Sequence, residues 1–377
     1  MPVPLDGFTR TQQRFASMKF SAVPLMLVAL AAWSFAVSPS ANADILATGF
    51  FSGTIERFDQ ETGAQSTFAD LKTSPADFPG LSGIAFDASL NRVYASARIG
   101  GGVYSLDAIT GSVLGFQSFD PANQPAGVAV DAASNIYVAN SGLNTVGVFD
   151  SAWNALSTIT LPTANDLPSG LAFDDQNRLL ITTFNQSAAT GSIFRFNPAD
   201  DSVVVFADNL FPMNQAAVDA IGNVYAGGVA LSSDVVKLAG DGSTVSNPFI
   251  TIDEALLPVP PRPFTSPDFT SPGGITIDAD GNLIVAALGR TNPFSGDPVD
   301  PTNDVGDNFQ SNGGLWKFSP DGVLLETFPG TGSLTPLSSV AIVTAIPEPG
   351  SLAVLSLGAL ACRSLRRRRK RESGFGN

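Results

Sequence analysis

The sequence predicts an all-β fold: a six-bladed β-propeller with four-stranded antiparallel blades, the last blade closed by N- and C-terminal strands. The first observation is a repeat with a period near 44 residues, in which an apolar strand ends in an aspartate. The second is that one repeat is split between the two ends of the chain. The repeated aspartates are Asp87, Asp131, Asp174, Asp219 and Asp278, separated by 44, 43, 45 and 59 residues.

Each repeat contains enough strand-forming segments for one blade. The first two strands are joined by a short turn, as in LSGIAFDASLNRVYASA from Leu81. A third strand follows a variable loop, as in GGVYSLD from Gly101, and most copies continue into a fourth β-rich run, as in VLGFQSF from Val113. Polar and apolar residues alternate along these segments, which is typical of packed sheets. Four short strands in about 40 to 45 residues are the unit of a propeller blade.

The sixth blade is predicted from the leftover strands. LSSVAIV from Leu337 matches the first strand of a repeat, and three further strands begin near Asp44, Gly53 and Ala64. Five whole blades and one shared blade make six, and this closure covers edges that would otherwise pair with other chains.

The repeat resembles NHL repeats and the wider six-bladed superfamily that includes gluconolactonase-like and streptogramin-lyase-like proteins. The second copy, PAGVAVDAASNIYVANSGLNTVGVFD from Pro125, carries the resemblance best. The motif is structural, so it implies a fold and says little about function.

Residues 1–43 are expected to be a signal peptide. Lys19 precedes an apolar run over 22–37, and Ala41 and Ala43 form a small-x-small cleavage site that places the mature start near Asp44. Met18 would also open a signal peptide of ordinary length. An N-terminal membrane anchor is the alternative, but the apolar run is shorter than the roughly 20 residues of a span.

Residues 347–377 are expected to be a sorting tail that follows a propeller domain over 44–346. Pro347, Glu348 and Pro349 precede an apolar segment over 351–362 and an arginine-rich end over 363–371. The apolar segment can enter a bilayer, whereas the arginines are drawn to anionic cytoplasmic lipid. An ordinary C-terminal anchor shares these features except the Pro-Glu-Pro triplet.

The tail resembles the PEP-CTERM sorting signal of Gram-negative envelope and matrix proteins. The resemblance implies recognition of Pro347 to Pro349 by an exosortase-type processing enzyme, with transient anchoring in the inner membrane. The protein is therefore expected to be exported to the cell envelope or the extracellular space.

Charge and residue usage exclude several classes of function. The two ends hold ten of the 20 basic residues and three of the 34 acidic ones, so the body has a formal charge of −21 (10 minus 31). Such a surface repels nucleic acid. The chain has no histidine, and its single cysteine, Cys362, lies in the tail. Imidazole chemistry, and thiol nucleophiles or disulfides within the body, are therefore excluded.

No catalytic residue can be assigned. Gluconolactonase-like enzymes use carboxylates and an asparagine around a divalent cation, but their Pro-Asn-Gly motif is replaced here by triplets that begin at Pro125, Pro168 and Pro272. The repeated aspartates form either a ring of ligands or hairpin turns. The turn interpretation is favoured, because each is followed by a turn-forming asparagine at Asn91, Asn135, Asn177, Asn223 or Asn282.

Two insertions break the period, over 256–272 and 289–313. The first is proline-rich and is expected to cover one mouth of the channel or to act as a linker. The second is rich in oxygen ligands that suit calcium, although it lacks the regular spacing of a calcium loop. Its candidate ligands are Asp297, Asp300, Asp304 and Asp307.

The sequence thus favours a non-catalytic binding or scaffold module without a cofactor, whose envelope or matrix ligand is unknown. The alternative is a divalent-metal-dependent lactonase or esterase of the gluconolactonase-like class.

Overall fold

The computed structural model describes residues 43–344 apart from 73–78, 186, 229–231, 253–255, 257–268, 288–289, 292–312 and 330–336. The described part is almost entirely β-structure, with one short 3-10 turn, η1 (Pro121–Asn123). No helix within these ranges has the length and apolar character needed to cross a membrane.

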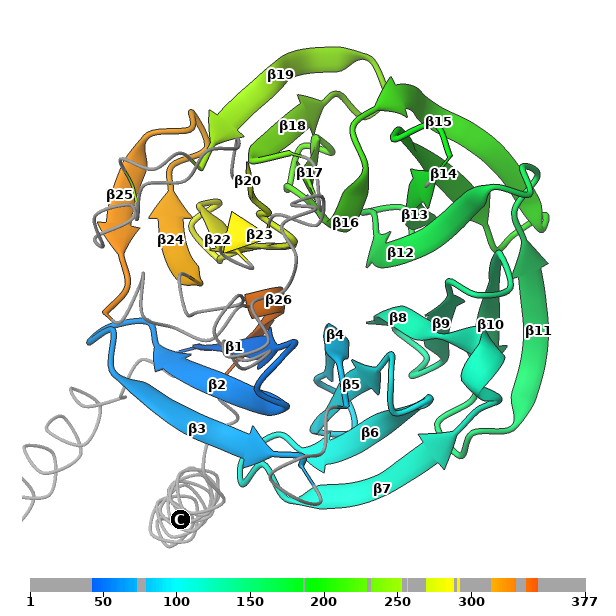
Figure 1. Ribbon diagram of the computed structural model, residues 1–377, viewed down its shortest axis with the longest axis horizontal. Coiled ribbons are helices and arrows are strands. Elements are labelled where there is room, and N and C mark those ends of the chain that lie inside the picture. Colours follow the sequence, from blue (N-terminus) through cyan, green and yellow to red (C-terminus); the bar gives the residue numbers. More distant parts are fainter. Residues whose placement is uncertain are drawn as a thin grey trace, which may run out of the picture. The chain divides into compact units, whose positions relative to one another are not determined.

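Six four-stranded sheets surround a central axis (Figure 1), which confirms the predicted six-bladed propeller. Every neighbouring pair of strands within a blade is antiparallel. A two-stranded sheet, β20 with β23, accompanies the fifth blade in the chain order.

In each of the first three blades, the strands follow the chain order from the axis outward. Blade 1 is β4 (Leu81–Asp87), β5 (Arg92–Ala97), β6 (Gly102–Asp107) and β7 (Val113–Ser118); blade 2 is β8 (Pro125–Val130), β9 (Ile136–Asn140), β10 (Thr145–Phe149) and β11 (Ala155–Thr160); blade 3 is β12 (Asp166–Phe173), β13 (Leu179–Asn185), β14 (Gly191–Asn197) and β15 (Ser202–Leu210).

Blades 4 and 5 follow the same order, whereas blade 6 begins at the axis with a strand from the C-terminal part of the chain. Blade 4 is β16 (Met213–Val218), β17 (Val224–Gly228), β18 (Asp234–Leu238) and β19 (Thr244–Thr251); blade 5 is β21 (Gly274–Ile277), β22 (Leu283–Ala287), β24 (Gly314–Phe318) and β25 (Leu324–Thr327); blade 6 is β26 (Leu337–Val343), β1 (Asp44–Gly49), β2 (Thr54–Asp59) and β3 (Gln65–Asp70); the small sheet is β20 (Phe269–Thr270) with β23 (Arg290–Thr291).

The sixth blade is closed by strands from both parts of the chain, as predicted. β26 pairs with β1, with Val343 opposite Asp44 and Val340 opposite Ala47. The carboxylate of Asp44 accepts a hydrogen bond from Arg57 Nε at 2.7 Å, which fixes the start of β1 against β2.

The two ends of the propeller differ in their connections. At one end, which we call the turn face, short turns join the first strand of a blade to the second and the third to the fourth. At the other end, the opposite face, the second strand joins the third and each blade joins the next. In blade 6, β26 ends and β1 begins at the turn face, so this pair has no connecting turn.

Apolar side chains fill the space between adjacent blades. Tyr94 of blade 1 packs with Val128 and Ile136 of blade 2, and Leu180 of blade 3 packs with Met213 of blade 4. The three inner strands of a blade are mostly buried, whereas the fourth strand is mostly exposed. The core is therefore a series of layers between sheets, which agrees with the alternating pattern of the strands.

We predict that the closing blade is essential to stability. Ile45 is fully buried in β1, so Ile45→Ala is expected to lower the free energy of unfolding by about 2–5 kcal/mol. Urea denaturation followed by tryptophan fluorescence measures this loss. Val113→Ala on the exposed strand β7 is the control and should change it by less than about 0.5 kcal/mol. Equal effects of the two substitutions would contradict the prediction.

Candidate functional site

The inner strand of each blade contributes two consecutive residues to a ring around the propeller axis, which we call the axial ring. In five blades the strand register shifts at this point. In blades 1, 2 and 4 both residues leave the ladder of their own blade, and in blades 3 and 6 only the first residue, Ser169 or Ser338, leaves it. Their backbone groups are then free to bond with neighbouring blades. The pairs are Ser82-Gly83, Ala126-Gly127, Ser169-Gly170, Asn214-Gln215, Gly273-Gly274 and Ser338-Ser339.

Glycine is required where the inner strands approach one another most closely. A Cβ atom on Gly170 would lie 1.9 Å from the carbonyl oxygen of Asn214, and one on Gly83 would lie 2.5 Å from that of Ala126. No side chain fits at these distances. The glycines of the repeated triplets are therefore explained by backbone approach.

Gln215 occupies a position at which four of the other blades have glycine and one has serine. Its Oε1 atom accepts hydrogen bonds from the backbone N–H groups of Ile275 (3.1 Å) and Val340 (3.0 Å) and from Ser339 Oγ (2.9 Å). Its Nε2 atom donates to the carbonyl oxygen of Val340 at 2.9 Å. One amide side chain thus bonds blade 4 to blades 5 and 6.

Hydroxyl groups join the remaining blades in the same way. Ser338 Oγ donates to the carbonyl oxygen of Leu81 at 2.7 Å, linking blade 6 to blade 1, and Ser169 Oγ donates to that of Met213 at 2.6 Å, linking blade 3 to blade 4. Ser96 Oγ donates to the carbonyl oxygen of Ala126, which links blade 1 to blade 2. Ser141 Oγ donates to the carbonyl oxygen of Pro168, which links blade 2 to blade 3.

A pocket at the ring, lined by residues of blades 1 to 4 and 6, has a volume of about 10 Å³, close to the least that holds one water molecule. Its lining consists of backbone, hydroxyl, amide and aliphatic groups and contains no ionisable side chain. Among the described residues, no three carboxylates, cysteines or histidines are grouped as a metal site would require. The ring can therefore hold the blades together, and it supplies no acid, base or charged ligand.

The repeated aspartates lie in the turns between the first and second strands, at the turn face. Asp131 Oδ1 accepts from the backbone N–H of Asn135 at 2.8 Å, and Asn135 Nδ2 donates to Asp131 Oδ2 at 2.8 Å. The same pair of bonds recurs at Asp219 and Asp278. Asp87 and Asp174 accept backbone bonds in their own turns. The five carboxylates are thus held apart by separate turns.

The left-handed residue of these turns is not always the asparagine. Asn91 and Asn177 have positive φ, but in the other three turns that conformation falls on Ser134, Gly222 and Gly281. In those three turns the asparagine side chain instead bonds to the aspartate.

Two of the turn aspartates also form ion pairs. Asp278 Oδ2 lies 2.7 Å from Lys317 Nζ, and Asp174 Oδ2 lies 2.7 Å from Arg178 Nε. Burial alone would raise the pKa of Asp278, but the hydrogen bonds from Lys317 and Asn282 outweigh it and hold the pKa below its ordinary value. The carboxylate is therefore ionised at neutral pH and already satisfied.

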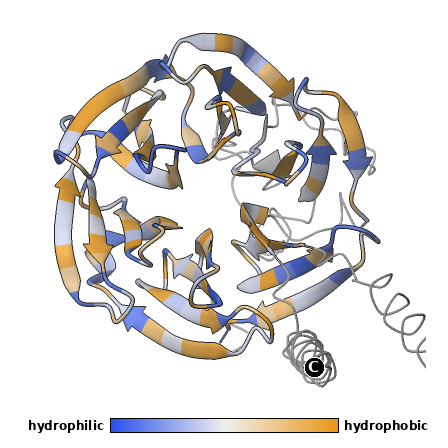
Figure 2. Cartoon of the chain, turned by 180° about the vertical axis from the view of Figure 1, so that it is seen from behind, coloured by the Kyte–Doolittle hydropathy of each residue, from blue (hydrophilic) through white to orange (hydrophobic). Residues whose placement is uncertain are grey.

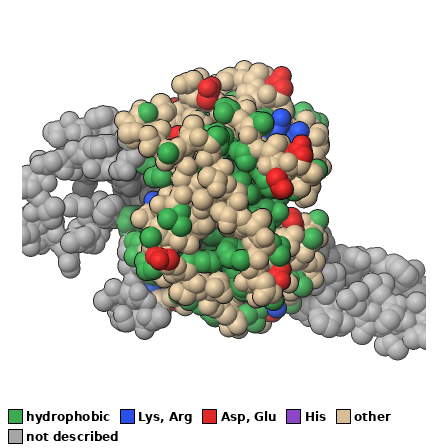
Figure 3. Space-filling model, turned by 90° about the vertical axis from the view of Figure 1, so that its right-hand side faces the viewer, with side chains coloured by type: hydrophobic (Ala, Val, Ile, Leu, Met, Phe, Trp, Pro, Cys, Tyr) green, Lys and Arg blue, Asp and Glu red, His purple; other side chains and the backbone are tan. Residues whose placement is uncertain are grey.

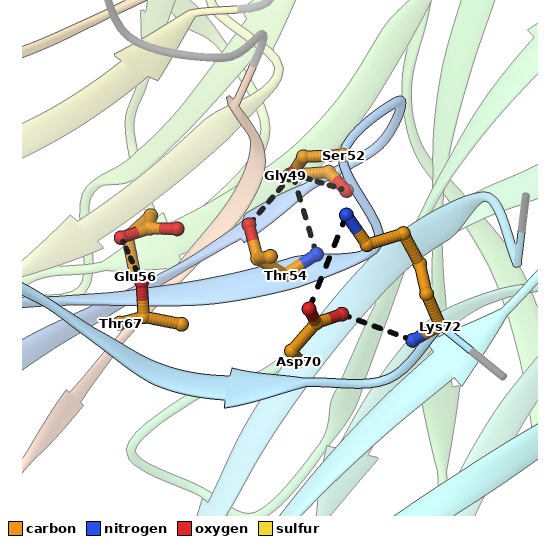
Figure 4. A network of polar contacts seen from close by, with 7 residues as sticks. All are labelled: Gly49, Ser52, Thr54, Glu56, Thr67, Asp70 and Lys72. Atoms are coloured by element: carbon orange, nitrogen blue, oxygen red, sulfur yellow. Dashed lines mark hydrogen bonds and ion pairs between the residues drawn. The ribbon is translucent and has the colours of Figure 1, made fainter. Parts of the chain in front are cut away.

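Carboxylates on the opposite face of the closing blade are also engaged one at a time (Figure 4). Glu56 accepts from Gln65 Nε2 at 3.3 Å and lies at 3.5 Å from Thr67 Oγ1, whereas Asp70 accepts from the backbone N–H of Lys72 at 3.2 Å. The adjacent turn is held by Ser52 and Thr54 without a charged group. This arrangement provides no pair of carboxylates for acid–base work.

The outer strands form a rim with exposed apolar side chains. Figure 2 shows apolar segments along these strands, and Figure 3 shows hydrophobic side chains on the rim. Each of these strands has one edge unpaired within the described part of the chain, and such edges are sites for association. Their exposed apolar residues are Val113, Leu114, Phe116, Leu156, Val204, Val205, Val245, Leu324 and Leu325.

Several predicted residues lie outside the described residues. These are the calcium candidates Asp297, Asp300, Asp304 and Asp307, the sorting residues Pro347, Glu348 and Pro349, and Ala41 of the cleavage site. Ala43 is described and directly precedes β1. Insertion 289–313 is described only at 290–291 and 313, and insertion 256–272 only at 256 and 269–272.

The fold and the axial ring define a closed six-bladed propeller. The C-terminal residues identify its destination: residues 345–370 match the PEP-CTERM protein-sorting motif. This motif implies recognition by exosortase-type machinery and export to the envelope or extracellular side, with membrane anchoring before processing. No curated protein sequence matches the chain significantly.

Solved structures with the same architecture share little sequence with this chain. A chain of a nidogen/laminin complex is 16% identical, with a TM-score of 0.56, covering 80% of this chain and 99% of that one. A gluconolactonase from Xanthomonas campestris is 18% identical (TM-score 0.51; 78% and 89% covered), and luciferin-regenerating enzyme is 16% identical (TM-score 0.52; 79% and 83% covered). These likenesses show the fold alone.

The sequence analysis did not single out Gln215. An alignment of the six inner strands would have exposed it, because a long amide replaces glycine or serine there.

We predict that the hydrogen bonds of Gln215 contribute a large part of the stability of the axial ring. Gln215→Ala leaves the backbone donors of Ile275 and Val340 without their acceptor, at a cost of about 1–3 kcal/mol for each group that water does not reach. Thermal unfolding measures the loss. Gln176→Ala, in an exposed turn, is the matched control and is expected to be near neutral. An unchanged melting temperature of Gln215→Ala would refute this role.

The ion pair of Asp278 predicts a pH dependence. Because the folded pKa lies below the unfolded value of about 3.9, the stabilisation is fully present above that value and is lost as the pH falls through the folded pKa. Lys317→Met is expected to lower stability at pH 7 by about 1–3 kcal/mol, and the difference should narrow below pH about 4. Melting curves between about pH 3 and 7 test this.

The exposed pair of Lys72 and Asp70 is the control, since Nζ and Oδ2 lie 4.0 Å apart and Asp70 is 56% exposed. Lys72→Met is expected to have little effect at any pH. A pH-independent difference for Lys317→Met would contradict the assignment.

Proposed function

We propose that this protein is an exported, non-catalytic binding or scaffold module of the cell envelope or extracellular matrix, and that its body works without a cofactor. The sorting motif at 345–370 supports the destination. The expected signal peptide over 1–43 supplies the entry into the export route, and the apolar segment 351–362 supplies transient inner-membrane anchoring through the tail.

The observation that carries the non-catalytic part is the closed axial ring. The pocket at the ring, with a volume of about 10 Å³ and a lining of uncharged groups, has no room for a substrate and no group that transfers a proton. The amide of Gln215 instead makes its hydrogen bonds to the inner strands of blades 5 and 6. These features suit a rigid body whose surface does the work.

The rim supports a role in binding. Exposed aliphatic side chains such as Val204, Val205 and Leu156 lie on outer strands, and neither those strands nor their neighbours β7 and β19 contain lysine or arginine. Natural edge strands usually carry such charges to prevent association. A rim without them favours association with an envelope or matrix partner.

The metal-dependent lactonase alternative finds no support in the described channel lining. Its test is direct: the purified body is titrated with calcium while its melting temperature and lactone turnover are recorded. We expect no lactone turnover, and we expect calcium to shift the melting temperature no more than magnesium does. Magnesium is the control because it also screens the surface charge. A calcium-specific rise in melting temperature together with turnover would overturn the non-catalytic proposal.

The sorting proposal has its own measurement. Mass spectrometry of the secreted protein is expected to show a start near Asp44 and a new C-terminus before the arginine-rich end. Replacing Pro347, Glu348 and Pro349 by alanine should leave the precursor in the membrane fraction, because recognition is lost while the apolar segment remains. A secreted form that still ends at Asn377 would refute processing.

A further inference from the structure

The chain enters and leaves the propeller at the turn face. β1 begins at Asp44 and β26 ends at Val343, and these two residues are register partners. β26 is the innermost strand of its blade, so the chain leaves close to the axis and away from the rim (Figure 1).

The connection from this point to the apolar segment of the tail is short. Only residues 344–350, seven in all, lie between Val343 and Ser351. A fully extended chain covers at most about 3.6 Å per residue, so the eight steps from Val343 to Ser351 span no more than about 29 Å.

The body is larger than this reach. A compact domain of about 300 residues has a radius of gyration of about 19 Å, which corresponds to a body about 50 Å across. To bring the opposite face to a bilayer, the connection would have to run from the axis to the rim and then along the height of a blade. It is too short for that path.

We propose that the turn face is the membrane-proximal face of the anchored precursor, and that the opposite face points away from the bilayer. This inference rests on the proposed function, because it requires the tail to be inserted. It identifies the surface that faces the bilayer, and it leaves the rim and the opposite face accessible to partners before processing.

The charge of the turn face opposes close contact with the bilayer. Aspartates occupy its turns, and anionic lipid headgroups repel them. This repulsion favours a separation between the body and the bilayer, up to the length of the connection. The turn aspartates include Asp59, Asp87, Asp107, Asp131, Asp150, Asp174, Asp219, Asp241 and Asp278.

The experiment measures how fast single cysteines react in the anchored precursor. The precursor carries Cys362→Ser, which removes the native thiol. It also carries alanine at residues 347–349, which prevents processing, so the tail stays attached. Ile109→Cys and Ile221→Cys place thiols on the turn face, and Ile99→Cys and Leu143→Cys place them on the opposite face. All four native side chains are exposed aliphatics, between 50% and 85% accessible, so the set is matched.

A maleimide linked to a long polyethylene glycol is added to intact membrane vesicles with the body outside, and to the soluble body as reference. We expect the two turn-face thiols to react several-fold more slowly in the anchored precursor than in the soluble body, and the opposite-face thiols to react equally in both. A flexible Gly/Ser insertion of about 20 residues after Thr344 should remove the difference, because it lengthens the connection.

The outcomes separate the two proposals. Equal rates at all four thiols in a membrane-bound precursor, or slower reaction at the opposite face, would overturn the orientation alone. A precursor found in the soluble fraction would overturn the anchoring and the orientation together.

Discussion

The close approach of six inner strands around one axis is the constraint on which the rest of this structure depends. Glycines at Gly83, Gly127 and Gly170 let the backbones come within contact, and the register shifts at these points release backbone groups to bond across blades. Once these bonds are made, each sheet is placed against its neighbour and the apolar layers between blades are aligned. Gln215 completes the ring where blades 4, 5 and 6 meet.

This way of closing the axis determines which groups lie at the centre of the propeller. Among the described residues, the positions around the axis are occupied by amide, hydroxyl, aliphatic and backbone groups. The repeated aspartates lie instead in separate turns, where each accepts hydrogen bonds within its own hairpin, and Asp278 also pairs with Lys317. The exposed surface left for recognition is the apolar rim and the two faces.

The blade architecture followed from the sequence because it rests on local signals: an apolar strand, an Asp turn and a fixed period. Even the split blade could be predicted, since LSSVAIV at Leu337 matched a first strand without its partners. The axial bonding could not. Ser338 and Thr48 meet across the closing blade, and Gln215 reaches Val340 from 125 residues away, so no local pattern shows that these side chains share a ring. The apolar rim likewise could be recognised only from the strand order of each sheet, which shows which strands are outermost.

The closing blade also sets the order of events during biogenesis. Thr48 and Ser338, which face each other there, are 290 residues apart in the chain, and contacts of such separation form late and slowly. A chain that crosses the inner membrane N-terminus first presents β1 to β3 long before β26 arrives. Until then, those strands have no inner neighbour and expose an edge that can pair wrongly. The propeller can therefore close only after β26, the last strand of the body, has followed the others across the membrane.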